Sequence, residues 1–145
     1  MRSKKIYDIV QELKEKYETR DPFRLCKALD ILVLYVPLVR VNGFYQHFDG
    51  QDIIYINQDL NDDEKTLVCA HELGHALLHT NVNTIFLETH KFVENKYERE
   101  ADAFAINLLY EDLNLSTELP LVNWKADNLS LIKTVTKHRK NDKMV

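Results

Sequence analysis

Hydrophobic residues near the N-terminus recur close to the 3.6-residue period of an α-helix, so residues 3–18 are predicted to form an amphipathic helix. The positions on its apolar face are Ile6, Ile9, Val10, Leu13 and Tyr17. A short second helix is expected over residues 22–29. Asp21 is a favourable N-cap for it, and Pro22 is a favourable first helical residue.

The middle of the chain has the composition of β-strands separated by turns. The run Ile31–Val36 is rich in β-branched and aromatic residues and predicts a strand that ends at Pro37. Asn42-Gly43 and Asp49-Gly50 are both turn signals. The clearest strand is Ile53–Asn57, which we expect to lie at an edge of the sheet and to be able to pair with an extended substrate.

The second half of the chain is predicted to be mainly helical. Two long helices are expected over about 62–80 and 95–110, and one more over about 123–139 after the break at Pro120. Helices that flank a small antiparallel or mixed sheet indicate an α+β fold. We therefore expect a single domain over residues 1–145, with a core at about 4–110 and a C-terminal helical tail at 111–145.

Composition and charge narrow the function classes. With 145 residues and 45% hydrophobic residues, the chain can bury a core without disulfides. With a net charge of −4, the chain has no overall positive field that would argue for nucleic-acid binding. Cys26 and Cys69 lie in no metal or redox spacing and are read as reduced thiols. The N-terminus lacks the apolar core of a signal peptide, and no apolar run reaches the ~20 residues of a membrane span. We expect a cytoplasmic protein.

The stretch "VCAHELGHALLHT" contains an H-E-x-x-H motif on a predicted helix. His71 and His75 are one turn apart and about 40° apart around the helix axis, so both rings can reach one zinc ion. Glu72 lies about 100° from His71, beside the metal, where its carboxylate can take a proton from a water. His79 is about 12 Å along the axis from His71, so it is expected to be a structural or cleft-lining histidine.

A third ligand must come from another element, and the helix containing "YEREADAFAINLL" is the best source. Glu98 and Asp102 share its apolar face, whereas Glu100 lies on an opposite face that looks solvated, together with Ala103 and Asn107. We therefore expect Glu98 to be the third zinc ligand and Asp102 to accept the free ring N–H of His71.

Simpler readings stay open for several of these residues. Glu100 is the alternative ligand, Glu98 fits a capping box with Asn95, and Asp102 fits a plain surface acid. His47 and His90 are more simply explained as surface histidines, and Cys69 as a residue of the core. Gly74 is expected to leave room beside the ligands.

"HELGHALLH" together with "EREADAFAINLL" resembles the ImmA/IrrE family of small zinc metallopeptidases of bacteria, phages and mobile elements. "DPFRLCKALDI" and the stretch from "GFYQHFDG" to the H-E-x-x-H motif also resemble this family, and the motif pair is shared with gluzincins. The resemblance implies a zincin-like fold with one zinc per chain held by His71, His75 and Glu98. It implies Glu72 as the base and Asp102 beside the ligands.

The resemblance also implies a regulatory role. Members of the family cleave a helix-turn-helix repressor, so the expected partner is a protein of that type, with no direct nucleic-acid or membrane binding. The alternatives are an anti-repressor or interaction module that uses zinc only for folding, and a component of a toxin–antitoxin pair. An intact Glu72 favours the enzyme, because a structural zinc site does not use a base.

Overall fold

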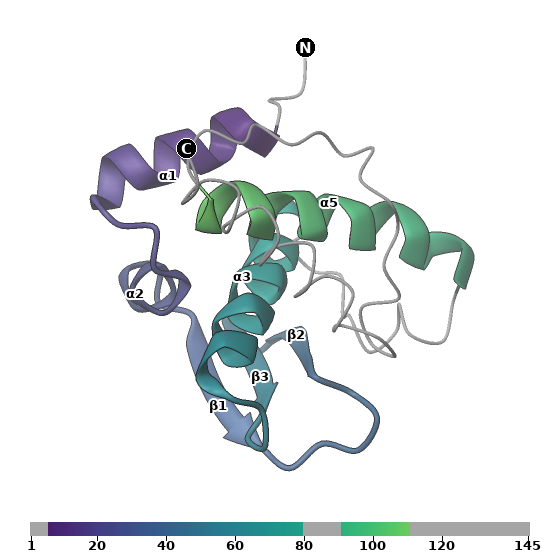
Figure 1. Ribbon diagram of the computed structural model, residues 1–145. Helices are drawn as coiled ribbons and strands as arrows, with labels where there is room; N and C mark the ends of the chain where they lie inside the picture. The colour runs from purple at the N-terminus through teal and green to yellow at the C-terminus, as the bar shows by residue number, and fades with distance from the viewer. Residues whose placement is uncertain (1–5, 80–90, 111–145) are drawn as a thin grey trace, which may run out of the picture.

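The computed structural model describes residues 6–79 and 91–110, drawn in Figure 1. In chain order the elements are α1 (Ile6–Tyr17), α2 (Pro22–Ala28), β1 (Leu32–Val36), β2 (Gly43–Phe48), β3 (Gln51–Asn57), α3 (Asp62–Leu78) and α5 (Lys91–Leu109). These helices and the small mixed sheet confirm the predicted α+β class. The helix predicted over 123–139 lies outside the described residues. None of the described helices is long and apolar enough to cross a membrane.

The three strands form one sheet in the order β1-β3-β2. β1 runs parallel to β3, and β2 runs antiparallel to it. Our expectation that Ile53–Asn57 lies at an edge is wrong, because β3 is hydrogen-bonded on both sides. Among the described strands, the edges of the sheet belong to β1 and β2.

The two turn signals have different roles. Asp49 and Gly50 form the two-residue turn between β2 and β3, with φ of 51° and 78°, which matches the turn type that hairpins prefer. Gly43 instead begins β2. A β-carbon on Gly43 would lie 2.5 Å from Cγ1 of Val68 and 2.7 Å from the carbonyl oxygen of Tyr55, so glycine is needed there for space.

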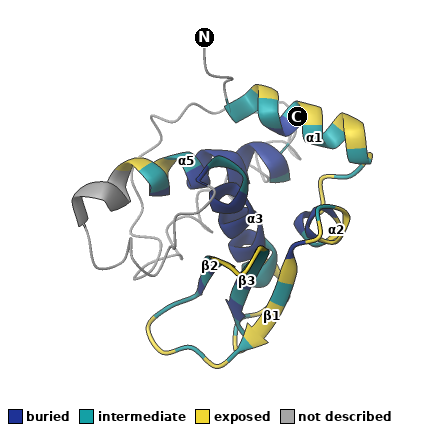
Figure 2. Cartoon of the chain, turned by 180° about the vertical axis from the view of Figure 1, so that it is seen from behind, coloured by how far each residue is buried: buried dark blue, intermediate teal, exposed yellow. Residues whose placement is uncertain are grey.

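Helix α3 is the buried centre of the fold. Asn61 and Glu64 start the helix with a capping box, in which each side chain accepts from the other residue's backbone N–H at 2.8 and 2.9 Å. Figure 2 shows α3 in dark blue between the sheet and α5. Every residue from Leu67 to Ala76 is buried, so any polar group on this stretch requires a partner within the protein.

Helix α2 contacts α3 through two cysteines. Cys26 and Cys69 are both buried and free, and their sulfur atoms lie 3.8 Å apart. This contact agrees with the expectation of reduced thiols in the core. The hydrogen bond to Cys26 and, after it, burial raise the pKa of Cys69, which makes it a poor nucleophile.

Helix α5 corrects two of the sequence readings. It begins at Lys91, so Asn95 is not its N-cap and Glu98 is not part of a capping box there. The face of Ala103 and Asn107 is not solvated, since these residues are 0% and 2% exposed. Helix α5 packs against α1 as well as α3. Asn107 adapts to burial by donating to the carbonyl oxygen of Ala103 at 2.8 Å.

Candidate metal centre

Helix α3 carries the H-E-x-x-H motif in its buried part. His71, Glu72 and His75 are each 0% exposed, and the centroids of the two imidazole rings lie 4.9 Å apart. One nitrogen or oxygen from each of the three side chains lies within 4.8 Å of the others. The four-residue spacing therefore brings two imidazoles and a carboxylate together, as the sequence predicted from helix geometry.

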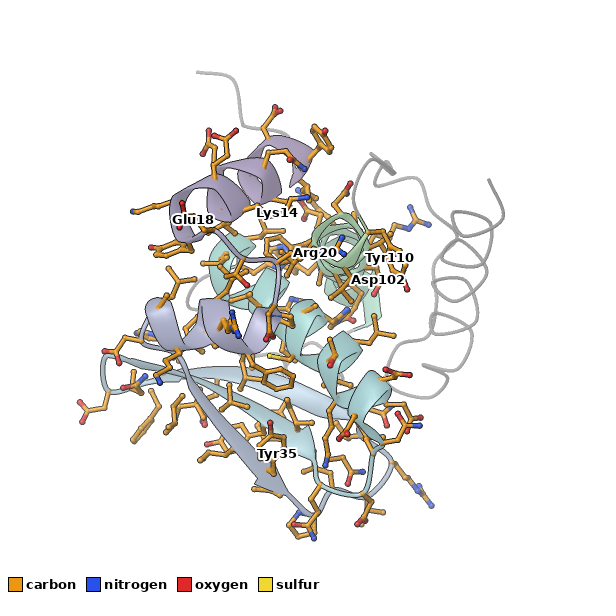
Figure 3. All side chains as sticks on the ribbon, turned by 60° about the vertical axis from the view of Figure 1, so that its left-hand side comes forward. Lys14, Glu18, Arg20, Tyr35, Asp102 and Tyr110 are labelled. Carbon is orange, nitrogen blue, oxygen red and sulfur yellow. The ribbon has the colours of Figure 1, made fainter. Side chains whose placement is uncertain are left out.

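Gly74 allows α5 to approach this part of α3. A β-carbon on Gly74 would stand 3.1 Å from Cβ of Phe104 and 3.2 Å from Cα of Ala101. We expected Gly74 to prevent crowding of the ligands, but its neighbours are on α5. The close contact between the two helices is what brings the acids of α5 to the histidines of α3. Figure 3 shows α3 between the sheet, which carries Tyr35, and α5, which carries Asp102.

The carboxylate of Glu98 faces the rings of both His71 and His75. Its Oε2 is 3.0 Å from Nε2 of His71, and its Oε1 is 3.0 Å from Nε2 of His75, with only 3% of the residue exposed. Glu100 faces a different histidine, His79. Its Oε1 is 3.2 Å from Nε2 of His79, and its side chain is 30% exposed. Of the two acids considered from the sequence, the structure thus places Glu98 at the H-E-x-x-H motif.

Asp102 lies on the other side of the His71 ring. Its Oδ1 is 2.8 Å from Nδ1 of His71, and the residue is 3% exposed, so it is not a surface acid. His71 therefore has a carboxylate within hydrogen-bonding distance of each ring nitrogen. Carboxylates this close to both ring nitrogens favour one orientation of the ring.

Glu72 occupies a different position from Glu98. Its Oε2 is 3.9 Å from Nε2 of His71, which is farther than the 3.0 Å of Glu98. Its side chain points toward β2, since a β-carbon on Gly43 would lie 3.8 Å from Cγ of Glu72. Glu72 thus lies beside the ring nitrogens rather than between them.

His79 lies against the site, which agrees with the expectation of a structural or cleft-lining histidine, although the sequence did not predict its contact with His75. Its Nδ1 is 3.0 Å from Nδ1 of His75, and the edge of its ring faces Tyr97 at a centroid distance of 4.4 Å. The four-residue spacing from His75 was the available signal. The sequence did not show that Glu100 would lie on the far side of the ring. Burial and the neighbouring His75 lower the pKa of His79 to about 4.

The other histidines and acids considered from the sequence lie elsewhere. His47 is exposed on the hairpin, where its Nδ1 lies 2.7 Å from Oδ1 of Asp52, and Tyr45 donates to the same oxygen at 2.7 Å. This agrees with the surface reading of His47. His90 lies outside the described residues.

The electrostatics of the protein without metal favour positive charge at the centre. Burial alone would lower the pKa of His71, but the charge of Glu98 and the contact with Asp102 outweigh it and raise that pKa to about 10. Burial alone would raise the pKa of Glu98, yet the charge and hydrogen bonds of His71 and His75 hold it well below its usual value. Burial raises the pKa of Asp102. A site that attracts a proton this strongly is also suited to a cation.

The donor set fits a divalent metal. Two imidazole nitrogens and a carboxylate are ligands that such ions use in proteins. With bonds of ~2.0–2.1 Å, the ligand atoms of a tetrahedral site stand about 3.3 Å apart. The 3.0 Å separations between Glu98 and the two Nε2 atoms are close to that spacing. His71, His75 and Glu98 are therefore the candidate ligands of such an ion.

Comparison with known proteins agrees with this geometry. The family model described as the IrrE N-terminal-like domain matches residues 26–130. An uncharacterized immunity region protein 2 of Bacillus phage phi105 is 44% identical over 105 residues, which are 71% of this chain and 66% of that protein. The match thus spans just under two thirds of the phage protein's own length.

A second relative is the metallopeptidase ImmA of Bacillus subtilis (strain 168). It is 33% identical over 123 residues, which are 83% of this chain and 72% of that protein. No solved structure matches the chain significantly. The family match covers more than half of the chain and includes both the H-E-x-x-H helix and α5. The chain therefore belongs to the ImmA/IrrE family of metallopeptidase-like proteins, which confirms the resemblance seen in its motifs.

Proposed function

We propose that this protein is a zinc-dependent endopeptidase that cleaves a repressor of the helix-turn-helix type. The observation that carries the proposal is the position of the Glu98 carboxylate, 3.0 Å from Nε2 of both His71 and His75, with Glu72 buried beside them. An ion with a purely structural role needs only its ligands, His71, His75 and Glu98. It does not need the second buried carboxylate, Glu72.

In this proposal the chain's own residues have separate roles. His71, His75 and Glu98 hold the ion, and Asp102 orients the ring of His71 through its Nδ1. A zinc ion held there would supply Lewis-acid chemistry, which makes water more acidic and a peptide carbonyl more electrophilic. Glu72 takes the proton of the attacking water and passes it to the leaving amine.

The assignment of Glu72 as base and Glu98 as ligand rests on distance and chemistry. Both oxygens of Glu98 face ring nitrogens, whereas the nearer oxygen of Glu72 is 3.9 Å from His71 Nε2. A base must stay off the ion to accept a proton, and general-base help contributes roughly 10²–10⁴-fold to a rate. Glu72 lies close enough to the ligands to act on a water held there.

The sheet edge at β2 is the proposed binding place for an extended substrate. β3 cannot accept another strand because β1 and β2 already pair with it. β2 has one side without a strand among the described residues, and at Gly43 its backbone passes next to Glu72. A substrate strand paired with β2 would run past the base, and main-chain hydrogen bonds would hold it there.

The choice of a repressor as substrate rests on the family resemblance and on one relative. That relative, the phage phi105 protein, is named for an immunity region. A helix-turn-helix repressor encoded next to the gene for this chain is therefore the substrate to try first.

The deciding experiment uses Glu72→Gln, which keeps size and shape but cannot accept the proton. The variant should bind zinc as well as the wild type, while cleavage of the neighbouring repressor falls by roughly 10²-fold or more. Repressor length on a gel and induction of its promoter are measured in the same cells. Glu15→Gln on the exposed side of α1 is the matched control and should behave as wild type.

The Glu72→Gln variant and the wild-type protein test different claims. Normal induction by Glu72→Gln with intact repressor would show a non-catalytic binding module that keeps the metal site. If the wild-type protein leaves the repressor intact and its promoter silent, the neighbouring repressor is not the substrate.

A further inference from the structure

Two histidines and a carboxylate form a chain of hydrogen-bonding contacts that leads away from the metal centre. Nδ1 of His75 lies 3.0 Å from Nδ1 of His79, and Nε2 of His79 lies 3.2 Å from Oε1 of Glu100. We propose that His79 and Glu100 are positioning residues that fix the ring of His75 in the tautomer that presents Nε2 to the metal. This inference rests on the metal site proposed above.

The direction of these hydrogen bonds follows from the atoms involved. A contact between two Nδ1 atoms at 3.0 Å requires one N–H and one lone pair. A carboxylate only accepts, so the Nε2 of His79 that faces Glu100 must carry the hydrogen. A neutral His79 then has a bare Nδ1. This nitrogen accepts the N–H of His75 Nδ1, and the lone pair of His75 stays on Nε2.

The opposite arrangement is excluded once a cation lies at the centre. If His79 Nδ1 donated to His75, then His75 would carry its hydrogen on Nε2, where no ion could bind it. The lone pair of His79 Nε2 would also face the lone pairs of Glu100 at 3.2 Å. The Glu100 carboxylate at one end of these contacts and the ion at the other therefore favour the same arrangement, with hydrogen on Nδ1 of His75 and on Nε2 of His79.

Packing holds the intermediate ring in place. His79 is 6% exposed and ends α3, where its backbone N–H still bonds to the carbonyl oxygen of His75 at 2.8 Å. The ring also makes an edge contact with the ring of Tyr97. A ring held by these contacts can transmit the orientation set by Glu100, because it has little freedom to rotate.

The two metal histidines are thus oriented in different ways. His71 meets the carboxylate of Asp102 directly, at 2.8 Å from Nδ1. His75 reaches the carboxylate of Glu100 only through His79. Loss of a residue that hydrogen-bonds to a metal-binding histidine typically changes metal affinity by about 10–100-fold. Loss of His79 should therefore be measurable as weaker zinc binding.

The test compares His79→Phe with His79→Gln. Phenylalanine keeps the ring and its contact with Tyr97 but removes both nitrogens, and it should weaken zinc affinity by about 10–100-fold. Glutamine offers a carbonyl oxygen to His75 Nδ1–H and should recover part of that loss. Affinity is measured by competition with a chromophoric chelator. Glu100→Gln should lie between the wild type and His79→Phe, and Asp59→Asn at an exposed position is the charge-matched control.

A second measurement needs no variant. Nitrogen-15 spectra of the histidine rings in the zinc-loaded wild type report which nitrogen carries hydrogen. The expected result is hydrogen on Nδ1 of His75 and on Nε2 of His79. Hydrogen on Nδ1 of His79, or equal zinc affinity in the wild type and His79→Phe, would overturn this inference alone. A wild-type protein that binds no zinc would overturn the proposed metal site as well.

Discussion

Gly74 of α3 and Ala101 of α5 lie so close that a β-carbon on the glycine would stand 3.2 Å from Cα of the alanine. This contact links the two helices that carry the residues of the proposed metal centre. His71 and His75 come from α3, and Glu98 and Asp102 come from α5. The distance between the helices therefore decides whether the four side chains meet.

Gly74→Ala should destabilise the protein and weaken the metal site together. Helix propensity alone favours alanine by about 1 kcal/mol, but overpacking a tight contact typically costs about 1–3 kcal/mol. The clash is with a Cα and a Cβ of α5, which cannot rotate away, so the cost should exceed the gain. Urea unfolding and chelator competition measure both effects. Unchanged stability together with unchanged zinc affinity would mean that α5 has room to move.

Glu98→Gln should remove most of the bound zinc. Purified wild-type protein is expected to hold about one zinc per chain, with an open position left for water. The neutral amide is a much poorer ligand than the carboxylate that faces both Nε2 atoms. Glu100→Gln should keep its metal at saturating zinc, since Glu100 acts only through His79. Metal analysis after equilibrium dialysis against saturating zinc decides between them, and the reverse pattern would exchange the roles of the two acids.

Asp102→Ala should lower zinc affinity by about 10–100-fold without preventing folding. The reason is the loss of the acceptor that lies 2.8 Å from Nδ1 of His71. Asp102→Asn keeps an acceptor oxygen and should lose less affinity than the alanine variant. If alanine and asparagine bind zinc as tightly as aspartate does, the orienting role of Asp102 is wrong.

The metal-free protein should become less stable as the pH rises above neutrality. The pKa of His71 is raised to about 10 in the folded protein by the charge of Glu98 and the contact with Asp102, which outweigh burial. The unfolded chain releases that proton near pH 6.5. The folded state therefore binds more protons between these values, and its stabilisation is complete below about pH 6.5 and lost as the pH approaches 10.

Chelator-treated protein unfolded in urea at pH 7 and pH 9 measures this effect. The free energy of unfolding should fall by no more than about 1.4 kcal/mol per pH unit for one proton. His71→Phe is the control and should flatten the slope. Zinc loading should do the same, because the ion takes the place of the proton. A rise in stability over this range would mean that His71 is neutral in the metal-free protein.

Local patterns were enough to predict much of this protein. The apolar period of residues 3–18, the Asp21-Pro22 start of the second helix and the Asp49-Gly50 turn depend on neighbours within a few residues, and the structure contains all three features. The convergence of His71 and His75 also follows from helix geometry alone, since four residues turn a helix by little more than one revolution.

Long-range packing decided the rest. Ile53–Asn57 is central rather than an edge because β1 pairs with it in parallel, and strand order is not encoded in any single strand. The face of Ala103 and Asn107 is buried in a helix that packs against both α1 and α3, although its own composition looked solvated.

The candidate site divides in the same way. The spacing within α3 determined which side chains share one helix face, because covalent geometry sets the turn per residue. Only the tertiary structure could place Glu98 between two rings and Glu100 behind His79, because these contacts depend on how closely α5 approaches at Gly74. That distance is decided by the packing of two helices far apart in the sequence, and no local pattern contains it.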